Sequence, residues 1–596
     1  MKTSPTRLVI VAGLMAGAAI AALAPVGAQD TPESLLPPGF DNPAPAPAPP
    51  PTRPADSGRP SAPSTTTSTT ESPSGDAPIG NSTVAAGPVA PVDLSRYELP
   101  DYAKRTLDRV GVTAWGNRSF PADAFGHTDG HALMTLMQRL DAPVASRWVS
   151  IALRRALQSP IDTPKGLNGA DFAAERSWLL LRMGESNAAR AVVQEVDTEN
   201  YTPKLYRVAL QSALAAGDPG MVCPIADAAA GMLPERGWKM AQAWCAGLGG
   251  EPNKAQQLLS RARGRSGEGD IDNLLGEKVV GTGAGGRGAV TIEWGSVTRL
   301  NAWRWGLATA TGETIPEELY ATVGPQVRYW AALSPHLTSQ ARLRWAELAA
   351  AQGVFSTAGL VSLYGEIEQE EEAASASVAA ARDLRTAYTG ADAAARITAL
   401  KTLWNGPESQ RERYARLILT ARAASAIPAN AELAEDADQL VASMLTGGLV
   451  APALNWRGVV KKGGEGWMLL ALADPAGAVV SSADFDTYRG ASSRRHSQLA
   501  LAGLAGLGLF SEGDVRRHAQ ALEVQVGGVN NWTRAIDRAA RAGDSGTVAL
   551  LAATGMQSRG WSSVSPEALF HIIAAFRATG MQDYARMIAV EAITRA

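Results

Sequence analysis

Apolar residues recur at intervals of three and four from about residue 94 to the end of the chain, a spacing typical of amphipathic α-helices. The apolar positions of two such stretches are Val144, Trp148, Ile151, Leu153, Ala156 and Leu157, and then Leu343, Ala346, Leu348 and Ala350. Runs that alternate between β-branched and polar residues, as half-buried strands do, are nearly absent. The pattern therefore predicts an all-α body over residues 94–596.

A body of roughly 500 residues is too long for one hydrophobic core, so it needs several domains or stacked repeats. A predicted helix ends at each of Gly184, Gly217 and Gly250, which lie 33 residues apart. Small or apolar residues follow each glycine at the fifth, ninth and twelfth positions: Ala189, Val222 and Ala255; Val193, Ala226 and Leu259; Val196, Ala229 and Ala262. These offsets share one helical face, so the period predicts helical hairpins, clearest over about 171–262.

This arrangement resembles the tetratricopeptide repeat (TPR), a helix–turn–helix unit of about 34 residues. Pro234 stands seventeen residues after Gly217, where that family often places a proline before the next unit. The family's Trp-Leu-Gly pattern is not matched, and turn signals outside the clearest units return irregularly. The resemblance implies an α-solenoid of helical hairpins with a long concave face for binding.

The first 28 residues have the pattern of a secretory signal peptide. A positively charged start precedes an uncharged apolar run from Leu8 to Leu23, and a small-residue cleavage pattern ends at Ala28. An uncleaved N-terminal membrane anchor is the alternative, and no second apolar stretch of spanning length follows. The sequence therefore predicts a periplasmic or secreted protein.

Residues 29–93 are rich in Pro, Ala, Ser and Thr, with segments such as "PAPAPAPPP" and "SAPSTTTSTT". Such a composition cannot bury enough apolar surface to offset the entropy lost on ordering, so we expect a disordered linker. A passive spacer is the simplest interpretation; an O-glycosylated stalk and a ligand for a proline-binding domain are the alternatives.

The chain has two cysteines, Cys223 and Cys245, each eleven positions from Pro234. In the fold that the resemblance implies, the helices on either side of this turn pack antiparallel and bring the two cysteines together. Disulfides persist in oxidising compartments such as the periplasm. We expect a Cys223–Cys245 disulfide, and the alternative is two small buried core residues.

Glycines at 281, 283 and 286 spell the G-x-G-x-x-G pattern of dinucleotide sites. The required strand before it and acidic residue about 20 positions after it are missing, so a loop between helices is expected. The dipeptide Glu185-Ser186 resembles the catalytic acid of lytic transglycosylases, but the apolar and glycine-rich surroundings of that acid are missing. No catalytic or cofactor-binding residue is predicted.

His127 and His131 are spaced four apart with Asp129 between them, a weak metal-ligand pattern. Because Gly130 would interrupt a helix there, we expect ordinary surface or helix-start residues and no metal site. Five glutamates in 365–373 predict a solvated helix face, with contact to a cation or basic partner as the alternative. A net charge of −3 gives no basic field and argues against nucleic-acid binding.

Tryptophans crowd the stretch that holds Trp294, Trp303, Trp305, Trp330 and Trp345. If 294–307 is helical, Trp303 and Trp305 lie on different stripes, and Trp294 shares the stripe of Trp305. Burial on two sides, as in the middle of a solenoid, is one interpretation. The other is that Trp294 and Trp305 are exposed in a concave groove and anchor a partner.

These features favour a non-catalytic scaffold or binding protein of the bacterial cell envelope, whose groove contacts a protein, peptide or glycan. One alternative is an envelope enzyme, or its regulatory subunit, that acts on cell-wall glycan. Another is a secreted structural protein.

Overall fold

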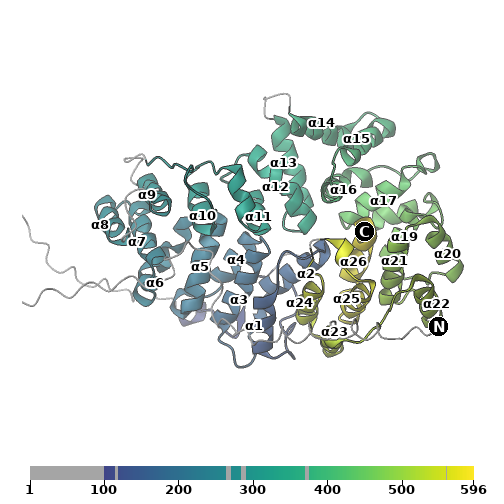
Figure 1. Cartoon of the computed structure of the whole chain (residues 1–596), viewed down its shortest axis with the longest axis horizontal. Coiled ribbons are helices and arrows are strands. Elements are labelled where there is room, and N and C mark those ends of the chain that lie inside the picture. Colours follow the sequence, from purple (N-terminus) through teal and green to yellow (C-terminus); the bar gives the residue numbers. More distant parts are fainter. Residues whose placement is uncertain (1–99, 114–118, 264–269, 284–289, 370–374, 559) are drawn as a thin grey trace, which may run out of the picture. The chain divides into compact units, whose positions relative to one another are not determined.

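The computed structural model describes residues 100–113, 119–263, 270–283, 290–369, 375–558 and 560–596. The predicted signal peptide and linker, residues 1–28 and 29–93, lie outside the described residues. Regular structure in the described part of the chain is helical, apart from one antiparallel pair of two-residue strands, β1 (Arg109–Val110) and β2 (Ile161–Asp162). The all-α prediction is therefore confirmed for these residues (Figure 1).

The first helices follow one another as packed neighbours. They are α1 (Gly130–Arg139), α2 (Arg147–Gln158), α3 (Gly169–Arg182), α4 (Ser186–Gln194), α5 (Pro203–Ala216), the 3-10 helix η4 (Pro219–Ile225), α6 (Ala226–Met232), α7 (Arg236–Leu248), α8 (Pro252–Ala262) and α9 (Ile271–Gly283). Side chains of Ser146, Asn168 and Thr202 accept backbone N–H groups at the starts of α2, α3 and α5, as helix N-caps do. Helices α3 and α4 form one hairpin, and α7 and α8 form another.

The 33-residue period corresponds to real helix ends. Gly184, Gly217 and Gly250 follow the carboxyl ends of α3, α5 and α7 with φ of +89°, +66° and +79°, a conformation that favours glycine. All nine of the apolar positions predicted from the period are buried. These hairpins fit the predicted solenoid.

The Cys223–Cys245 disulfide is present, with the two Cα atoms 5.3 Å apart. Cys245 lies in α7, as predicted. Cys223 lies in η4 instead of an α-helix, because Pro224 has no backbone N–H to continue an α-helical hydrogen-bond ladder. The second element of this hairpin is therefore η4 followed by the short α6.

The next three helices pack back along the first ones. They are α10 (Ala302–Ala310), α11 (Pro325–Leu333) and α12 (Ser339–Gln352). Helix α10 contacts α5 and α9, α11 contacts α4 and α5, and α12 contacts α2 (Figure 1). The indole Nε1 of Trp330 donates to the Leu181 carbonyl at 3.1 Å and ties α11 to α3.

The remaining helices lead back to α2. They are α13 (Thr357–Gln369), α14 (Ala376–Thr389), α15 (Ala393–Asn405), α16 (Gln410–Ser425), α17 (Ala437–Thr446), α18 (Val450–Leu454), α19 (Glu465–Ala473), α20 (Ser482–Ala491), α21 (Arg494–Leu507), α22 (Glu512–Leu522), α23 (Asn531–Ala542), α24 (Ser545–Gly555), α25 (Pro566–Ala578) and α26 (Gln582–Thr594). Both α24 and α26 pack on α2 (Figure 1). Such contacts go beyond a stack in which each repeat touches only its sequence neighbours.

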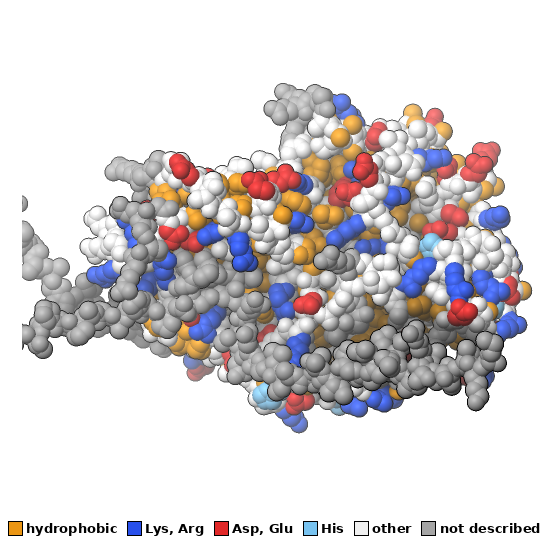
Figure 2. Space-filling model, in the orientation of Figure 1, with side chains coloured by type: hydrophobic (Ala, Val, Ile, Leu, Met, Phe, Trp, Pro, Cys, Tyr) orange, Lys and Arg blue, Asp and Glu red, His pale blue; other side chains and the backbone are white. Residues whose placement is uncertain are grey.

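The surface carries charges of both signs. Figure 2 shows Lys and Arg side chains interspersed with Asp and Glu over the face in view, consistent with a net charge of −3. None of the described helices combines the length and apolar character needed to cross a membrane.

Candidate functional site: two cavities beside helix α2

Helix α2 is the point at which segments far apart in the sequence meet. At its amino end, Glu591 of α26 accepts the backbone N–H groups of Arg147 at 2.8 Å and Trp148 at 3.2 Å. The Ser146 hydroxyl donates to the same carboxylate at 2.6 Å and accepts the N–H of Val149. Glu591 is 1 % exposed, and its negative charge stabilises the positive end of the α2 dipole.

The carboxyl end of α2 has the opposite arrangement. Arg176 of α3 is fully buried and donates to the carbonyls of Leu157, Ser159 and Val110 at 2.7–3.1 Å. Burial lowers the pKa of Arg176 to about 9, still above neutral pH, so the guanidinium stays charged beside the negative end of the dipole. Each end of the α2 dipole is thus bound by a buried side chain of the opposite charge, Glu591 at the positive end and Arg176 at the negative end.

Arg147, the first residue of α2, connects two further helices to this junction. Its Nε donates to the Ala350 carbonyl near the end of α12 at 3.0 Å, and its Nη1 donates to Thr446 at the end of α17 at 3.4 Å. Its guanidinium lies 5.0 Å from the centre of the Trp148 ring. We define the α2 junction as the set Ser146, Arg147, Trp148, Arg154, Arg155, Arg176 and Glu591.

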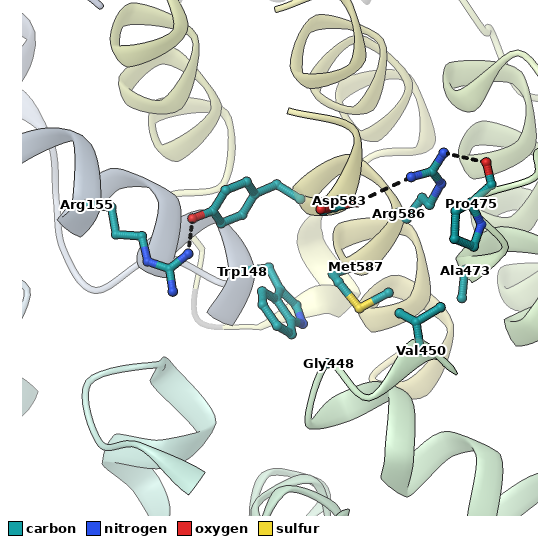
Figure 3. Close-up of a pocket in the computed structure, with 10 residues that line it drawn as sticks. Trp148, Arg155, Gly448, Val450, Ala473, Pro475, Asp583, Arg586 and Met587 are labelled. Atoms are coloured by element: carbon teal, nitrogen blue, oxygen red, sulfur yellow. Dashed lines mark hydrogen bonds and ion pairs between the residues drawn. The ribbon is translucent and has the colours of Figure 1, made fainter. Parts of the chain in front are cut away.

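One cavity of about 350 Å³, the apolar cavity, lies between α2 and α26. Figure 3 shows Trp148 and Met587 beside one another in its wall, with Val450 near them. Arg155 donates to the Tyr584 hydroxyl, and Arg586 bonds Asp583 at 3.4 Å. Its full lining is Trp148, Arg155, Gly448, Val450, Ala473, Pro475, Asp583, Tyr584, Arg586 and Met587.

A second cavity of about 350 Å³, the basic cavity, adjoins the first and shares Trp148 and Arg155 with it. Its lining is Arg147, Trp148, Ile151, Arg154, Arg155, Gly353, Val354, Phe355, Ser356, Thr357, Ala358, Ala421, Arg422, Gly447 and Leu449. Four of these residues are arginines, and none is an aspartate or glutamate. The cavity therefore combines positive charge with aromatic and aliphatic walls.

The carboxylate of Glu185 bonds an arginine of the basic cavity from behind the cavity lining. Glu185 pairs with Arg154 at 3.0 Å, and Arg154 also donates to the Gly353 carbonyl at 2.8 Å. Burial raises the pKa of Glu185 to about 7, although the neighbouring Arg154 lowers it. Glu185 is 5 % exposed and lines neither of the two cavities.

The tryptophans predicted from the sequence lie elsewhere. Helix α10 begins at Ala302, where the Asn301 side chain caps it, so 294–307 is not one continuous helix and the two stripes do not extend back to Trp294. Trp305 is 0 % exposed and its ring packs on Trp330 at 5.7 Å between centroids, so it lacks the exposure that an anchor needs and the core interpretation holds. Trp294 precedes the helix and is partly buried; its role in partner binding stays a prediction.

The histidines take ordinary positions. His131 lies in the first turn of α1, and Gly130 begins that helix instead of interrupting it. His127 has a side chain 70 % exposed and contacts Asp544 through Nδ1 at 2.7 Å. Among the described residues, no group of three or more His, Cys, Asp or Glu side chains is placed to hold a metal ion.

Two other sequence patterns lie partly in helices. Gly281 and Gly283 belong to α9, so the expected loop was wrong for these two, and Gly286 lies outside the described residues. The acidic stretch begins in α13, where Glu366 is about half exposed and Glu368 bonds Arg385 at 2.9 Å. The rest of that stretch, 370–373, is also outside the described residues.

The cavity arginines were missed at the sequence level. The segment "ASRWVSIALRR" holds Arg147, Arg154 and Arg155 within an apolar helical pattern, and charged residues on such a face were the available signal. Comparisons with known protein families, with curated proteins and with solved structures give no match to this chain. Function is therefore inferred from these residues and their geometry.

Proposed function

We propose that this chain is a non-catalytic scaffold or binding protein of the bacterial cell envelope, with a TPR-like solenoid as its helical framework. It binds its partner at the two cavities beside α2. The observation that carries the proposal is the pair of adjoining cavities of about 350 Å³ that share Trp148 and Arg155. Concave sites of this size with apolar walls and a few placed charges are typical of ligand binding.

The chemistry of the lining favours binding over catalysis. Acid–base or nucleophilic catalysis uses a positioned pair of groups, such as two carboxylates or a nucleophile with its base. The two linings contain one carboxylate, Asp583, and it pairs with Arg586. Guanidinium groups and a tryptophan are instead typical of binding hot spots.

An envelope enzyme or regulatory subunit is the second candidate, because Glu185 is a buried carboxyl with a pKa raised to about 7. The variant Glu185→Gln distinguishes this enzyme candidate from the binding protein. An enzyme that uses this acid loses activity on cell-wall glycan, whereas a binding protein retains partner capture with the same variant.

Export to the periplasm or the medium is part of the proposal. The Cys223–Cys245 disulfide and the absence of a membrane-crossing helix among the described residues are consistent with an exported protein. N-terminal sequencing of the periplasmic protein tests this: a chain that starts at residue 29 supports cleavage after Ala28. A chain that stays in the inner membrane with residues 1–28 attached supports the anchor instead.

Site-specific photocrosslinking in cells tests the binding site. A benzophenone amino acid replaces Ala358, an exposed residue in the wall of the basic cavity, and in a control replaces Gln256, an exposed residue of α8. We expect one discrete adduct from position 358 that position 256 does not give. Equal adducts at both positions, or adducts from position 256 alone, contradict the proposed site.

A further inference from the structure

We propose that the basic cavity is a binding site for an organic anion, a carboxylate or phosphate group carried on an apolar chain. This inference rests on the proposed function and names the chemical class of its ligand. Four guanidinium groups, those of Arg147, Arg154, Arg155 and Arg422, line the cavity, and no carboxylate does.

The four arginines differ in the hydrogen-bond and charge partners that the protein gives their guanidinium groups. Arg154 is the one with a carboxylate partner among the described residues, and Arg147 donates to two helix-end carbonyls. Arg155 bonds the neutral hydroxyl of Tyr584 and stacks on its ring. The Arg422 side chain is exposed. Positive charge in this wall therefore exceeds the negative charge bonded to it.

The surroundings of Arg147 also suit an anion in this cavity. Burial is the main cause that lowers the pKa of Arg147, and the positive charges of Arg154 and Arg595 lower it further. Tyr414 and Glu591 act in the opposite direction. An anion in the cavity would stabilise the charged form of Arg147.

The remaining walls suit an apolar carrier. The rings of Trp148 and Phe355 and the aliphatic side chains of Ile151, Val354 and Leu449 line the same space as the arginines. A volume of about 350 Å³ lies within the range of roughly 300–1,000 Å³ for small-molecule sites. A bare inorganic anion would leave these apolar walls without contact.

Polar groups at the start of α13 add donors. Ser356, Thr357 and Ala358 line the cavity, and the Ser356 hydroxyl accepts the Gly359 N–H at 2.9 Å. The Ser356 hydroxyl proton is directed away from that bond and can be donated to a ligand. Guanidinium and hydroxyl donors together match the oxygens of a carboxylate or a phosphate.

A purely structural role for the arginines is the competing explanation. It accounts for Arg147 and Arg154, which close the carboxyl ends of α12 and α17. It does not account for Arg422, which lies in the cavity wall with its side chain exposed. Arg422→Ala therefore removes a ligand contact with little expected effect on folding, and Arg541→Ala, an exposed arginine of α23, is the matched control.

Isothermal titration of the purified full chain is the test, with octyl phosphate, octanoate, octyltrimethylammonium, octanol and inorganic phosphate as probes. We expect octyl phosphate, octanoate or both to bind, with at least about 10-fold weaker binding of the uncharged and cationic probes. We expect Arg422→Ala to weaken the binding of the anion by about 10-fold and Arg541→Ala to leave that binding unchanged. Which of the two anions binds tighter distinguishes a phosphate ligand from a carboxylate ligand.

Three results overturn the inference: neither octyl anion binds, the cationic probe binds equally well, or both arginine variants weaken binding equally. The outcome is separable from that of the proposed function. A discrete photocrosslinked partner at position 358 together with no anion binding leaves the binding protein in place and removes only the anion site. Anion binding without any adduct at position 358 keeps the anion site and removes the macromolecular partner.

Discussion

The hairpins of α3–α8 and the α2 junction are built in different ways. In the hairpins, each helix packs on its neighbour in sequence, and small apolar residues at a 33-residue interval bury the contact. In the junction, a buried charge lies at each end of α2, and the one at its amino end, Glu591 of α26, is 444 residues from Arg147. Local apolar repetition makes a regular framework, and the long-range charged contacts make the cavities.

The two regions respond differently to mutation for a physical reason. A buried apolar residue loses transfer free energy in proportion to the surface removed. A buried charge that loses its partner becomes an uncompensated ion in a medium of low dielectric constant, which destabilises the fold far more. The junction should therefore be the more fragile of the two regions, and the following changes test that order.

The largest effect is expected for Glu591→Ala. It leaves the Ser146 hydroxyl and two backbone N–H groups at the start of α2 without this acceptor, and it removes the carboxylate partner of the Arg595 guanidinium. We expect the free energy of unfolding to fall by about 3–5 kcal/mol in urea titration. The control Glu251→Ala, at an exposed pair with Lys254, should change it by less than about 0.5 kcal/mol. A loss at Glu591 as small as the control would show that the junction does not hold the chain together.

Removal of the disulfide should act mainly on the hairpins. Replacing Cys223 and Cys245 together by alanine opens a loop of 22 residues, and the chain-entropy account gives a loss of about 3 kcal/mol. We expect faster hydrogen exchange in α5–α8 and unchanged exchange in α2. Faster exchange in α2 with α7 unaffected would contradict the separation of the two regions.

Two glycines of the same period form a matched pair. Both have positive φ, so alanine at either position carries the same backbone strain of about 1–2 kcal/mol. A Cβ on Gly184 would also lie 2.6 Å from the Tyr329 ring of α11, whereas a Cβ on Gly250 meets nothing within 4 Å. Gly184→Ala should therefore destabilise the protein by about 1–3 kcal/mol more than Gly250→Ala in urea titration. Equal losses of stability in the two variants would show that Tyr329 of α11 does not pack against Gly184 at the end of α3.

The last prediction concerns the pH dependence of stability that Glu185 contributes. Its folded pKa of about 7 lies above its ordinary value of 4.5, so between these values the unfolded chain releases a proton that the folded chain keeps. The free energy of unfolding therefore falls as pH rises through this window, by at most about 1.4 kcal/mol per pH unit. Urea midpoints at pH 5 and pH 7 should show this slope in the parent protein and a smaller slope in Glu185→Gln. Identical slopes would contradict the raised pKa.

The sequence predicts the hairpins well because their contacts are local. Val222 and Ala229 follow Gly217 closely in the sequence, so their spacing alone indicates their burial, although they lie in the two successive helices η4 and α6. Glu591 and Arg147 are separated by 444 residues, and periodicity carries no information about such a pair. A glutamate inside the apolar run "MIAVEAITRA" indicates a buried charge without naming its partner. The same limit applies to Trp305: its spacing indicates the helix face on which it lies, but not which other helix packs against that face.

Hydrogen exchange of the whole chain with and without saturating octyl phosphate tests the central claim that the basic cavity beside α2 binds an organic anion. We expect slower exchange in 353–358 and 447–450, the segments that line the cavities after α12 and α17. We expect no change in 171–262. Slower exchange confined to 171–262, or no change anywhere in the chain, would contradict this claim.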